Sequence, residues 1–197
     1  MFREKYPWPG GSLALGKALS SVLCEVRESL GAKPGDIPAE FRSRQVIVLC
    51  LGGLQVPGDS LGPRVGTYLK KSLPHQTVYG TISHSLDSRN LDQELERIKQ
   101  KHPGTIWLAV DAAQGGRHSV GQVTVRRGPV LPGVGLGLVL PALGEISITG
   151  VVCPRTRRWW QRIYGGGRDP EQWAALLSLV IAEGIVQTLG NGTISPT

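Results

Sequence analysis

Two aspartates stand at points of the sequence where carboxylate chemistry could be concentrated. Asp59 lies in the loop after the apolar run 45–51, and Asp111 directly follows the apolar run 105–110. If these runs are neighbouring parallel strands, their carboxyl ends open into one crevice, where open α/β sheets bind ligands. Two carboxylates in one crevice can share a proton or hold a metal ion, because like charges that lie close together resist ionising together. The sequence therefore predicts a site built on Asp59 and Asp111.

The loop that carries Asp59 has the composition of a tight turn before a helix. Gly58 permits a sharp bend, and Asp59 falls just ahead of a helix N-terminus, where a negative charge is favoured. This position leaves a second interpretation open, in which Asp59 is only an N-cap. Asp111 also has an alternative interpretation, in which it only marks the end of an apolar strand. Ser60 is expected to bind substrate beside Asp59, and no His at a fixed spacing makes it a nucleophile.

A glycine-rich loop, 128–138, is expected to lie close to the same crevice. Its run Pro132-Gly-Val-Gly-Leu-Gly137 superficially resembles a phosphate-binding loop. A dinucleotide fingerprint directly follows a strand and opens a helix, and this run does neither. Gly133 and Gly135 are instead expected to bring backbone amides to a substrate, and no cofactor is predicted.

The other nucleophiles and metal ligands are placed less favourably. Cys50 falls inside an apolar strand pattern, as an inert core thiol would. His84 and His118 fall on predicted loops, where each either enters the crevice or stays on the surface. The three cysteines show no C-x-x-C spacing, so neither a disulfide framework nor a zinc site is expected, and no metal is predicted. This cysteine usage fits a reducing, cytoplasmic location.

The chain carries a formal net charge of +7, concentrated partly in the segment 155–168. This segment mixes arginines with Trp159, Trp160 and Tyr164, a composition found on surfaces that dock nucleic acid or peptides. The alternative is that its tryptophans pack on the sheet while its arginines remain in water. We expect no nucleic-acid partner. We also expect no membrane contact, because no apolar stretch reaches the length of a membrane span and residues 1–11 do not form a signal peptide.

The elements that position these residues alternate between strand and helix. Short apolar, β-branched runs predict strands, and amphipathic periodicity predicts helices. The alternation implies parallel strands joined by right-handed crossovers. We therefore predict a three-layer α/β/α sandwich with a mostly parallel sheet and a 2-1-3 strand order. The predicted strands are 45–51, 77–79, 105–110, 120–125 and 145–152, and the predicted helices are 12–30, 61–72, 91–101 and 170–189.

Length bounds the number of domains, because 197 residues suit one core. We expect a single α/β domain over 45–190, an arm and helix over 1–44 that pack on it, and a tail over 191–197. Residues 1–11 are expected to be irregular, since the prolines near position 8 cannot continue a helix, and Asn90 is expected to cap its helix. Whether the protein forms a homo-oligomer is left open by the sequence.

Six motifs along residues 45–152 resemble, in the same order, those of the YyaC-type sporulation proteins of spore-forming bacteria. Several motifs in one order are far more specific than any single one. The N-terminal helix and the segment 155–168 lie outside this resemblance. The motifs are Val48–Gly52, Gly58–Pro63, Val78–Thr81, Ala109–Ala112, Pro132–Gly135 and Gly144–Gly150.

That family is similar to the germination protease of spores, an atypical aspartic endopeptidase that degrades small acid-soluble spore proteins. It is more distantly similar to the hydrogenase maturation endopeptidases, and the resemblance implies their fold. It also places Asp59 and Asp111 at the positions of the two carboxylates that are taken as catalytic in the germination protease. In the hydrogenase enzymes the equivalent pair, together with a His, holds a nickel ion.

This chain departs from the family pattern at two points. Gly53 and Leu54 stand where YyaC-type sequences usually carry a Thr-Asp pair, so any role of that extra acid is lost. No His matches the third nickel ligand of the hydrogenase enzymes. The resemblance thus implies a sporulation-associated endopeptidase that cuts a protein or peptide, with small acid-soluble spore proteins as candidates. The alternative is a non-catalytic sporulation protein that binds a protein or anionic partner through the crevice or the segment 155–168.

Overall fold

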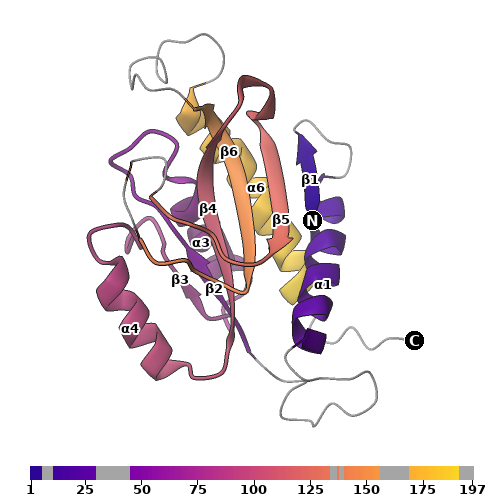
Figure 1. The fold of residues 1–197 in the computed structure, drawn as a ribbon, viewed down its shortest axis with the longest axis vertical. Helices are drawn as coiled ribbons and strands as arrows, with labels where there is room; N and C mark the ends of the chain where they lie inside the picture. The colour runs from indigo at the N-terminus through magenta and orange to yellow at the C-terminus, as the bar shows by residue number, and fades with distance from the viewer. Residues whose placement is uncertain (6–10, 30–44, 134–136, 138–139, 156–168, 191–197) are drawn as a thin grey trace.

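The computed structural model describes residues 1–5, 11–29, 45–133, 137, 140–155 and 169–190. One sheet forms its centre, with six strands in the order β1-β5-β6-β4-β2-β3 (Figure 1). Three neighbouring pairs are parallel, and β5 pairs antiparallel with both β1 and β6. The strands are β1 (Phe2–Lys5), β2 (Val46–Cys50), β3 (Val78–Tyr79), β4 (Ile106–Gly115), β5 (Gln122–Arg127) and β6 (Ile146–Pro154).

The strand order confirms the prediction for the first three parallel strands. The predicted strands 45–51 and 105–110 are adjacent and parallel as β2 and β4, with Val46 opposite Ile106 and Cys50 opposite Val110. Because β3 pairs with β2 on the other side, these strands follow the predicted 2-1-3 order. The carboxyl ends of β2 and β4 therefore lie at the same edge of the sheet, as the site prediction requires.

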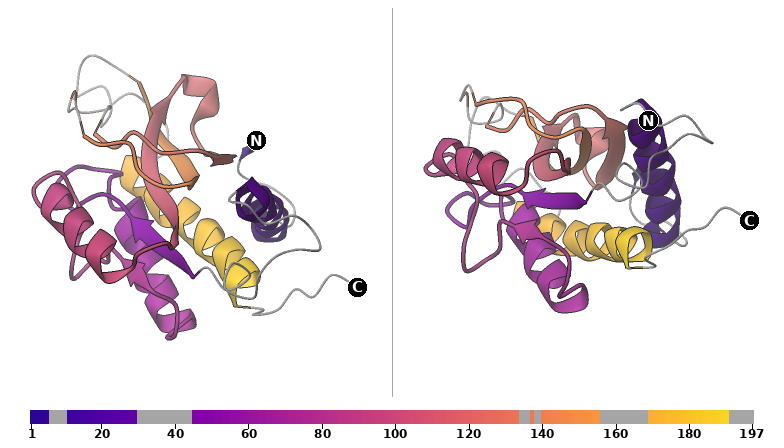
Figure 2. Two further views of the ribbon diagram at one scale, coloured as in Figure 1. Left: turned by 60° about the horizontal axis from the view of Figure 1, so that its bottom comes forward. Right: turned by 90° about the horizontal axis from the view of Figure 1, so that it is seen from below.

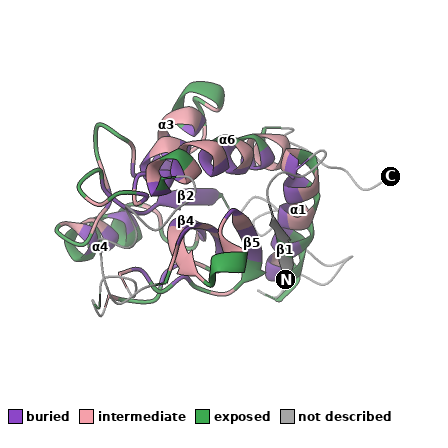
Figure 3. Cartoon of the chain, turned by 90° about the horizontal axis from the view of Figure 1, so that it is seen from above, coloured by how far each residue is buried: buried purple, intermediate pink, exposed green. Residues whose placement is uncertain are grey.

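Helices cover both faces of the sheet, which confirms the three-layer architecture. The helices α1, α3 and α6 share one hydrophobic core with the sheet, and α4 packs in a second core on the opposite face (Figure 2). Buried residues gather where the helices face the sheet (Figure 3). The helices are α1 (Gly11–Ser29), α3 (Leu61–Ser72), α4 (Leu91–Lys101) and α6 (Pro170–Leu189).

The apolar run of β2 is continuous because both faces of this strand are covered. Side chains alternate between the two faces of a sheet along a strand. Val46, Val48 and Cys50 accordingly belong to the core with α1, α3 and α6, whereas Ile47 and Leu49 belong to the core with α4. This arrangement anchors the end of β2, from which the Asp59 loop departs.

Three local expectations were wrong. Residues 2–5 are not irregular but form β1, which pairs with β5 from Phe2 opposite Val125 onward. The strand that was expected to end at residue 110 continues to Gly115, because β6 pairs with it along that whole stretch. Asn90 precedes α4, but its side chain does not cap the helix. Its carboxamide instead accepts a hydrogen bond from the Asp87 amide and donates one to the Ser85 carbonyl.

Helix α6 corrects the expectation that no stretch reaches the length of a membrane span. Its 20 residues are long and apolar enough by that measure. One side of the helix, however, lies in the core beside α1, α3 and β6, where Leu177, Ile181 and Ile185 are fully buried. The helix is therefore apolar because it is a core element of the domain.

Candidate active site

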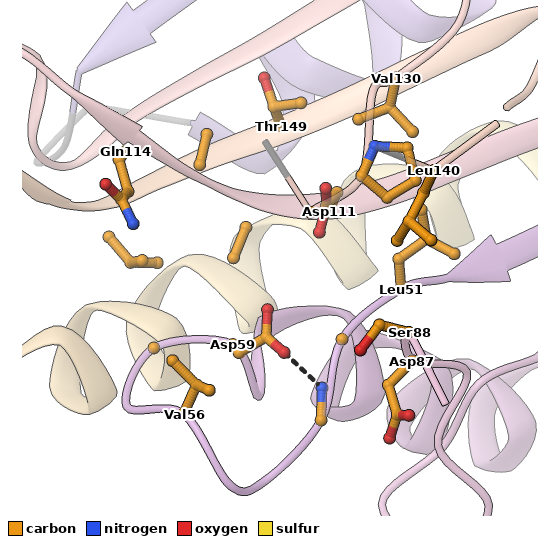
Figure 4. A pocket seen from close by; sticks show the side chains of 18 of the residues that line it. Leu51, Val56, Asp59, Asp87, Ser88, Asp111, Gln114, Val130, Leu140 and Thr149 are labelled. Atoms are coloured by element: carbon orange, nitrogen blue, oxygen red, sulfur yellow. Dashed lines mark hydrogen bonds between the residues drawn. The ribbon is translucent and has the colours of Figure 1, made fainter. Parts of the chain in front are cut away.

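A pocket of about 910 Å³ lies at the carboxyl ends of β2 and β4. Its walls come from the loops that follow β2 and β3, from the second half of β4 and from the segment before β6. Asp59 and Asp111 both line it, and Figure 4 shows their carboxyl groups on facing sides of the same space. The structure therefore brings together the two acids that the sequence predicts.

Asp59 is held in place by the loop that carries it. The Asp59 amide donates to the Val56 carbonyl over 3.0 Å, and a carboxylate oxygen of Asp59 accepts from the Gly53 amide over 2.7 Å (Figure 4). The N-cap position of α3 is Ser60, so the interpretation of Asp59 as a simple N-cap is wrong. Burial raises the pKa of Asp59, the Gly53 bond opposes that rise, and the nearby charges of Asp87 and Glu171 add to it.

Asp111 is the more deeply buried member of the pair. It lies within β4, opposite Thr149 of β6, so it does not mark the exit of its strand. Burial raises its pKa to about 7, the charge of Asp59 adds to the rise, and a hydrogen bond from the Ala112 amide opposes it. Asp111 therefore holds a proton up to about neutral pH, while Asp59 keeps an amide donor that favours its ionised form.

This pKa predicts how the stability of the protein depends on pH. The unfolded chain loses the Asp111 proton near pH 3.8, but the folded protein keeps it to about pH 7. Stability therefore falls as the pH rises from about 4 to about 7, and the difference between these values corresponds to roughly 4 kcal/mol at most. We expect Asp111→Asn to be more stable than the wild type at pH 8 and to lose that advantage near pH 4.

Urea unfolding of both proteins between pH 4 and pH 8 measures this difference. Asp92→Asn serves as the control, because Asp92 is exposed on α4. Its pH dependence should match that of the wild type. The same pH dependence in Asp111→Asn and wild type would show that Asp111 ionises normally in the fold.

Asp87 is a third acid of the pocket, and the sequence reasoning missed it. It lies in the loop after β3, and its carboxylate accepts hydrogen bonds from the Arg89 guanidinium at 2.6 and 3.0 Å. Arg89 is the main reason that the pKa of Asp87 falls to about 2. Asp87 is thus a permanent anion near Asp59. The rule that directs attention to the ends of parallel strands would have found it after the strand 77–79.

Ser60 does not reach the pocket, contrary to its expected contact with substrate. The residue is buried, and its hydroxyl donates to a Glu171 carboxylate oxygen over 2.5 Å and accepts from Arg64. Gly133 lines the pocket as expected, whereas Gly135 lies outside the described residues. Cys50 is fully buried, and burial raises the pKa of its thiol, in keeping with an inert core cysteine.

Glu171, in the first turn of α6, binds the residues on both sides of Asp59, Gly58 and Ser60. One of its oxygens accepts from the Gly58 amide over 3.0 Å, and the other accepts from Ser60 and from Arg64 at 2.9 Å. These contacts join a loop after β2 to a helix more than 100 residues later in the chain. No sequence pattern marks this pairing, because it exists only once α6 packs beside α3.

Removing the Glu171 charge should loosen this loop. We expect Glu171→Gln to lower the free energy of unfolding by about 1–2 kcal/mol, since an amide group cannot accept from all three donors. Glu183→Gln is the matched control, because Glu183 is exposed on the same helix. Thermal and urea unfolding compare the two variants. Equal stability in both would show that the Glu171 contacts contribute nothing measurable.

The donor set of the pocket does not fit the nickel site of the hydrogenase enzymes. None of the four histidines of the chain lines the pocket, and His84 and His118 are exposed elsewhere. Among the described residues, no group of three or more His, Cys, Asp or Glu side chains is placed to hold a metal ion. The acids that line the pocket are Asp59, Asp87 and Asp111. The segment 156–168 lies outside the described residues, and Arg155, just before it, lines the pocket.

One relative of known sequence agrees with the resemblance seen in the sequence. The chain is 33% identical over 140 residues to the uncharacterized protein YyaC of Bacillus subtilis (strain 168), a match that covers 71% of this chain and 63% of that protein. The [NiFe] hydrogenase maturation protease HycI of Thermococcus kodakarensis KOD1 matches with a TM-score of 0.34 and 15% identity, over 70% of this chain and 92% of the protease.

A family model matches residues 19–157, which extends the resemblance in both directions beyond residues 45–152. The model carries the description "Protein of unknown function (DUF1256)". The match spans most of α1 and the first residues of the segment 155–168. Between them it covers the strands β2, β3, β4, β5 and β6. The chain belongs to the DUF1256 family.

Proposed function

We propose that this protein is a sporulation-associated endopeptidase of the cytoplasm that hydrolyses peptide bonds with Asp59 and Asp111. The observation that carries the proposal is the buried Asp111, whose pKa of about 7 keeps a proton beside the carboxylate of Asp59 in one pocket. A carboxylic acid and a carboxylate in one site are the pair that acid–base hydrolysis requires. The resemblance to the germination protease supplies the reaction type.

The two aspartates take different roles in this proposal. The amide of Gly53 stabilises the ionised form of Asp59, which leaves its other oxygen to act as the base that removes a proton from water. The protonated Asp111 donates a hydrogen bond to the carbonyl oxygen of the scissile peptide bond. The water oxygen bonds to the carbonyl carbon, the C–N bond then breaks, and the amine leaves with the proton that Asp59 took up.

Asp87 contributes to the electrostatic environment of Asp59. Burial raises the pKa of Asp59, and the permanent charge of Asp87 adds to this rise, so Asp59 is a stronger base than an exposed aspartate. A base is more effective when its pKa approaches the working pH. The bond from Gly53 limits this effect and keeps Asp59 ionised when Asp111 is protonated.

A direct assay of peptide cleavage tests the proposal. The purified protein is incubated at pH 5–8, with and without a chelator, with small acid-soluble spore proteins and separately with a reduced, alkylated unfolded protein. Mass spectrometry then identifies new peptide termini. We expect cleavage that survives the chelator and declines above about pH 7, where Asp111 loses its proton. If no substrate is cut at any pH, the pocket is a binding site and the non-catalytic alternative stands.

A further inference from the structure

One end of the pocket is lined by apolar side chains. Figure 4 shows Leu51, Val130 and Leu140 on one side of Asp111, whereas Gln114 lies on the other side. The three residues belong to the second core, which α4 covers, so at this end the pocket meets the surface of that core. We call this lining the apolar wall, and it consists of Leu51, Leu86, Leu91, Val130, Leu131 and Leu140.

The strand register places the apolar wall directly beside Asp111. The pairing of β2 with β4 ends at Val110, whose carbonyl accepts from the Leu51 amide over 2.8 Å. Leu51 is thus level with Asp111, the next residue of β4. Leu49 and Ala109, two residues earlier on each strand, both face the second core. Because side chains alternate along a strand, Leu51 and Asp111 face the same side of the sheet.

Most of the apolar wall is fixed by packing and by backbone hydrogen bonds. The Gly52 amide donates to the Leu86 carbonyl over 2.9 Å, and Val130 exchanges two hydrogen bonds of 2.9 Å with Leu143. Leu86 and Val130 are buried in the second core, so this surface is formed before a ligand arrives. Leu131, by contrast, is 57% exposed. An apolar side chain at the margin of such a surface is stabilised when a ligand covers it.

We propose that the apolar wall is the specificity subsite of the protein and binds a bulky apolar side chain, such as that of leucine or phenylalanine, from a residue that flanks the scissile bond. The inference rests on the proposed endopeptidase activity and deepens it, because it names the class of cleavage site. In that mechanism Asp111 donates to the scissile carbonyl, so the side chain of a flanking residue lies close to the Asp111 carboxyl. The apolar wall is the surface that such a side chain meets (Figure 4).

The charges close to the apolar wall disfavour a charged occupant. The ionised carboxylates of Asp59 and Asp87 repel an acidic side chain. A basic side chain would compete with Arg89 for Asp87, whose oxygens already accept from Arg89 and from the Ser85 hydroxyl. Any charge placed against apolar side chains also loses its hydration. An apolar occupant instead keeps water away from Asp111, which favours the protonated form that the proposed mechanism needs.

Blocked single amino acids test the subsite without any need for cleavage. N-acetyl-leucine methylamide and N-acetyl-asparagine methylamide are closely similar in size and differ in the polarity of the side chain. Each is titrated to millimolar concentration into wild-type protein labelled with ¹³C at leucine and valine methyl groups. We expect the leucine probe to move the signals of Leu91 and Val130 and to leave those of Val22 and Leu177, in the other core, unmoved. The asparagine probe should move none of them.

The choice of cleavage site provides a second test. A peptide that the protein cuts is synthesised with leucine, phenylalanine, alanine or aspartate at each residue that flanks the cut bond. We expect kcat/KM to be about 10²-fold higher with leucine than with alanine or aspartate at one of these positions.

Val130→Ala should change this preference, because it removes two methyl groups from the apolar wall. We expect it to raise the ratio of kcat/KM for phenylalanine to that for leucine by about tenfold. Val22→Ala is the matched control, since Val22 and Val130 are both 5% exposed and Val22 lies in the other core. It should keep the wild-type ratio. A ratio of rates does not depend on how much of a destabilised variant is folded.

Unmoved Leu91 and Val130 signals, or equal movement with both probes, would overturn the inference. Cleavage without a preference for an apolar flanking residue, or an unchanged ratio in Val130→Ala, would overturn it as well. Peptide cleavage alongside any of these results would leave the proposed function standing. Movement of the two signals by the leucine probe alone, without cleavage of any peptide, would refute the proposed function and leave the site for an apolar side chain in place.

Discussion

Asp111→Asn is expected to reduce peptide hydrolysis by the protein by about 10³-fold at pH 6–7, with Asp59→Asn reducing it by a similar factor. Asparagine keeps the shape of each side chain but cannot take up a proton from water, and its amide is a weaker donor than a carboxylic acid. The substitution at position 111 removes the carboxyl group whose pKa lies at about 7. Any activity that remains should therefore no longer decline above neutral pH.

Asp87→Asn provides the matched control for this loss. Asp87 lines the same pocket, but its carboxylate is engaged by Arg89 and its pKa of about 2 excludes it from proton transfer near neutral pH. We expect this variant to keep its rate to within about tenfold, with a modest shift of its pH profile because a charge near Asp59 is lost. Initial rates on one peptide, measured from pH 5 to pH 8, compare all three variants. Asp111→Asn with the wild-type rate would contradict the proposed mechanism.

Gly52→Ala is expected to cost more than about 3 kcal/mol of folding free energy and to displace Asp59. Gly52 has a φ of +120°, which L side chains rarely adopt, and a Cβ atom there would lie 2.1 Å from the Asp59 carbonyl oxygen. The backbone conformation accounts for about 1–3 kcal/mol, and overpacking adds a similar amount. The obstacle is backbone rather than a flexible side chain, so the loop must move and the Asp59 carboxylate moves with it.

Gly128→Ala separates these two costs. Gly128 has a closely similar φ of +111°, but nothing lies within 4 Å of a Cβ atom built there. This variant should show only the backbone cost, and it should leave the pocket unchanged. Thermal and urea unfolding measure both variants, and peptide cleavage measures the effect on the site. Equal losses of stability would mean that the contact between Gly52 and Asp59 adds no cost.

The sequence predicts the regular elements of this fold well, and the reasons are local. The helices at 61–72, 91–101 and 170–189 appear with the predicted bounds, because turn residues and apolar periodicity are properties of a short stretch of chain. The continuous apolar run 45–51 likewise predicts a strand covered on both faces. Strand β1 was missed because four residues beside a proline-rich stretch become a strand only by pairing with β5.

The placement of Asp59 and Asp111 in one pocket was also within reach of the sequence. Parallel strands joined by crossovers deliver their carboxyl ends to one edge, so an acid after each of two neighbouring strands must approach the other. The states of the two acids were not predictable, because the pKa of about 7 at Asp111 depends on how completely the surrounding fold removes water from it.

The sequence by itself determined the layers, the order of the three strands β3, β2 and β4, and the pair of carboxylates, since each follows from patterns within one element and from the rules that connect elements. Only the tertiary structure decided that Ser60 turns away to Glu171, that Asp87 joins the pocket, and that β4 continues past β2. Each of these depends on atoms that are distant along the chain. Such contacts form only when the helices and strands have packed, and no local pattern of residues encodes them.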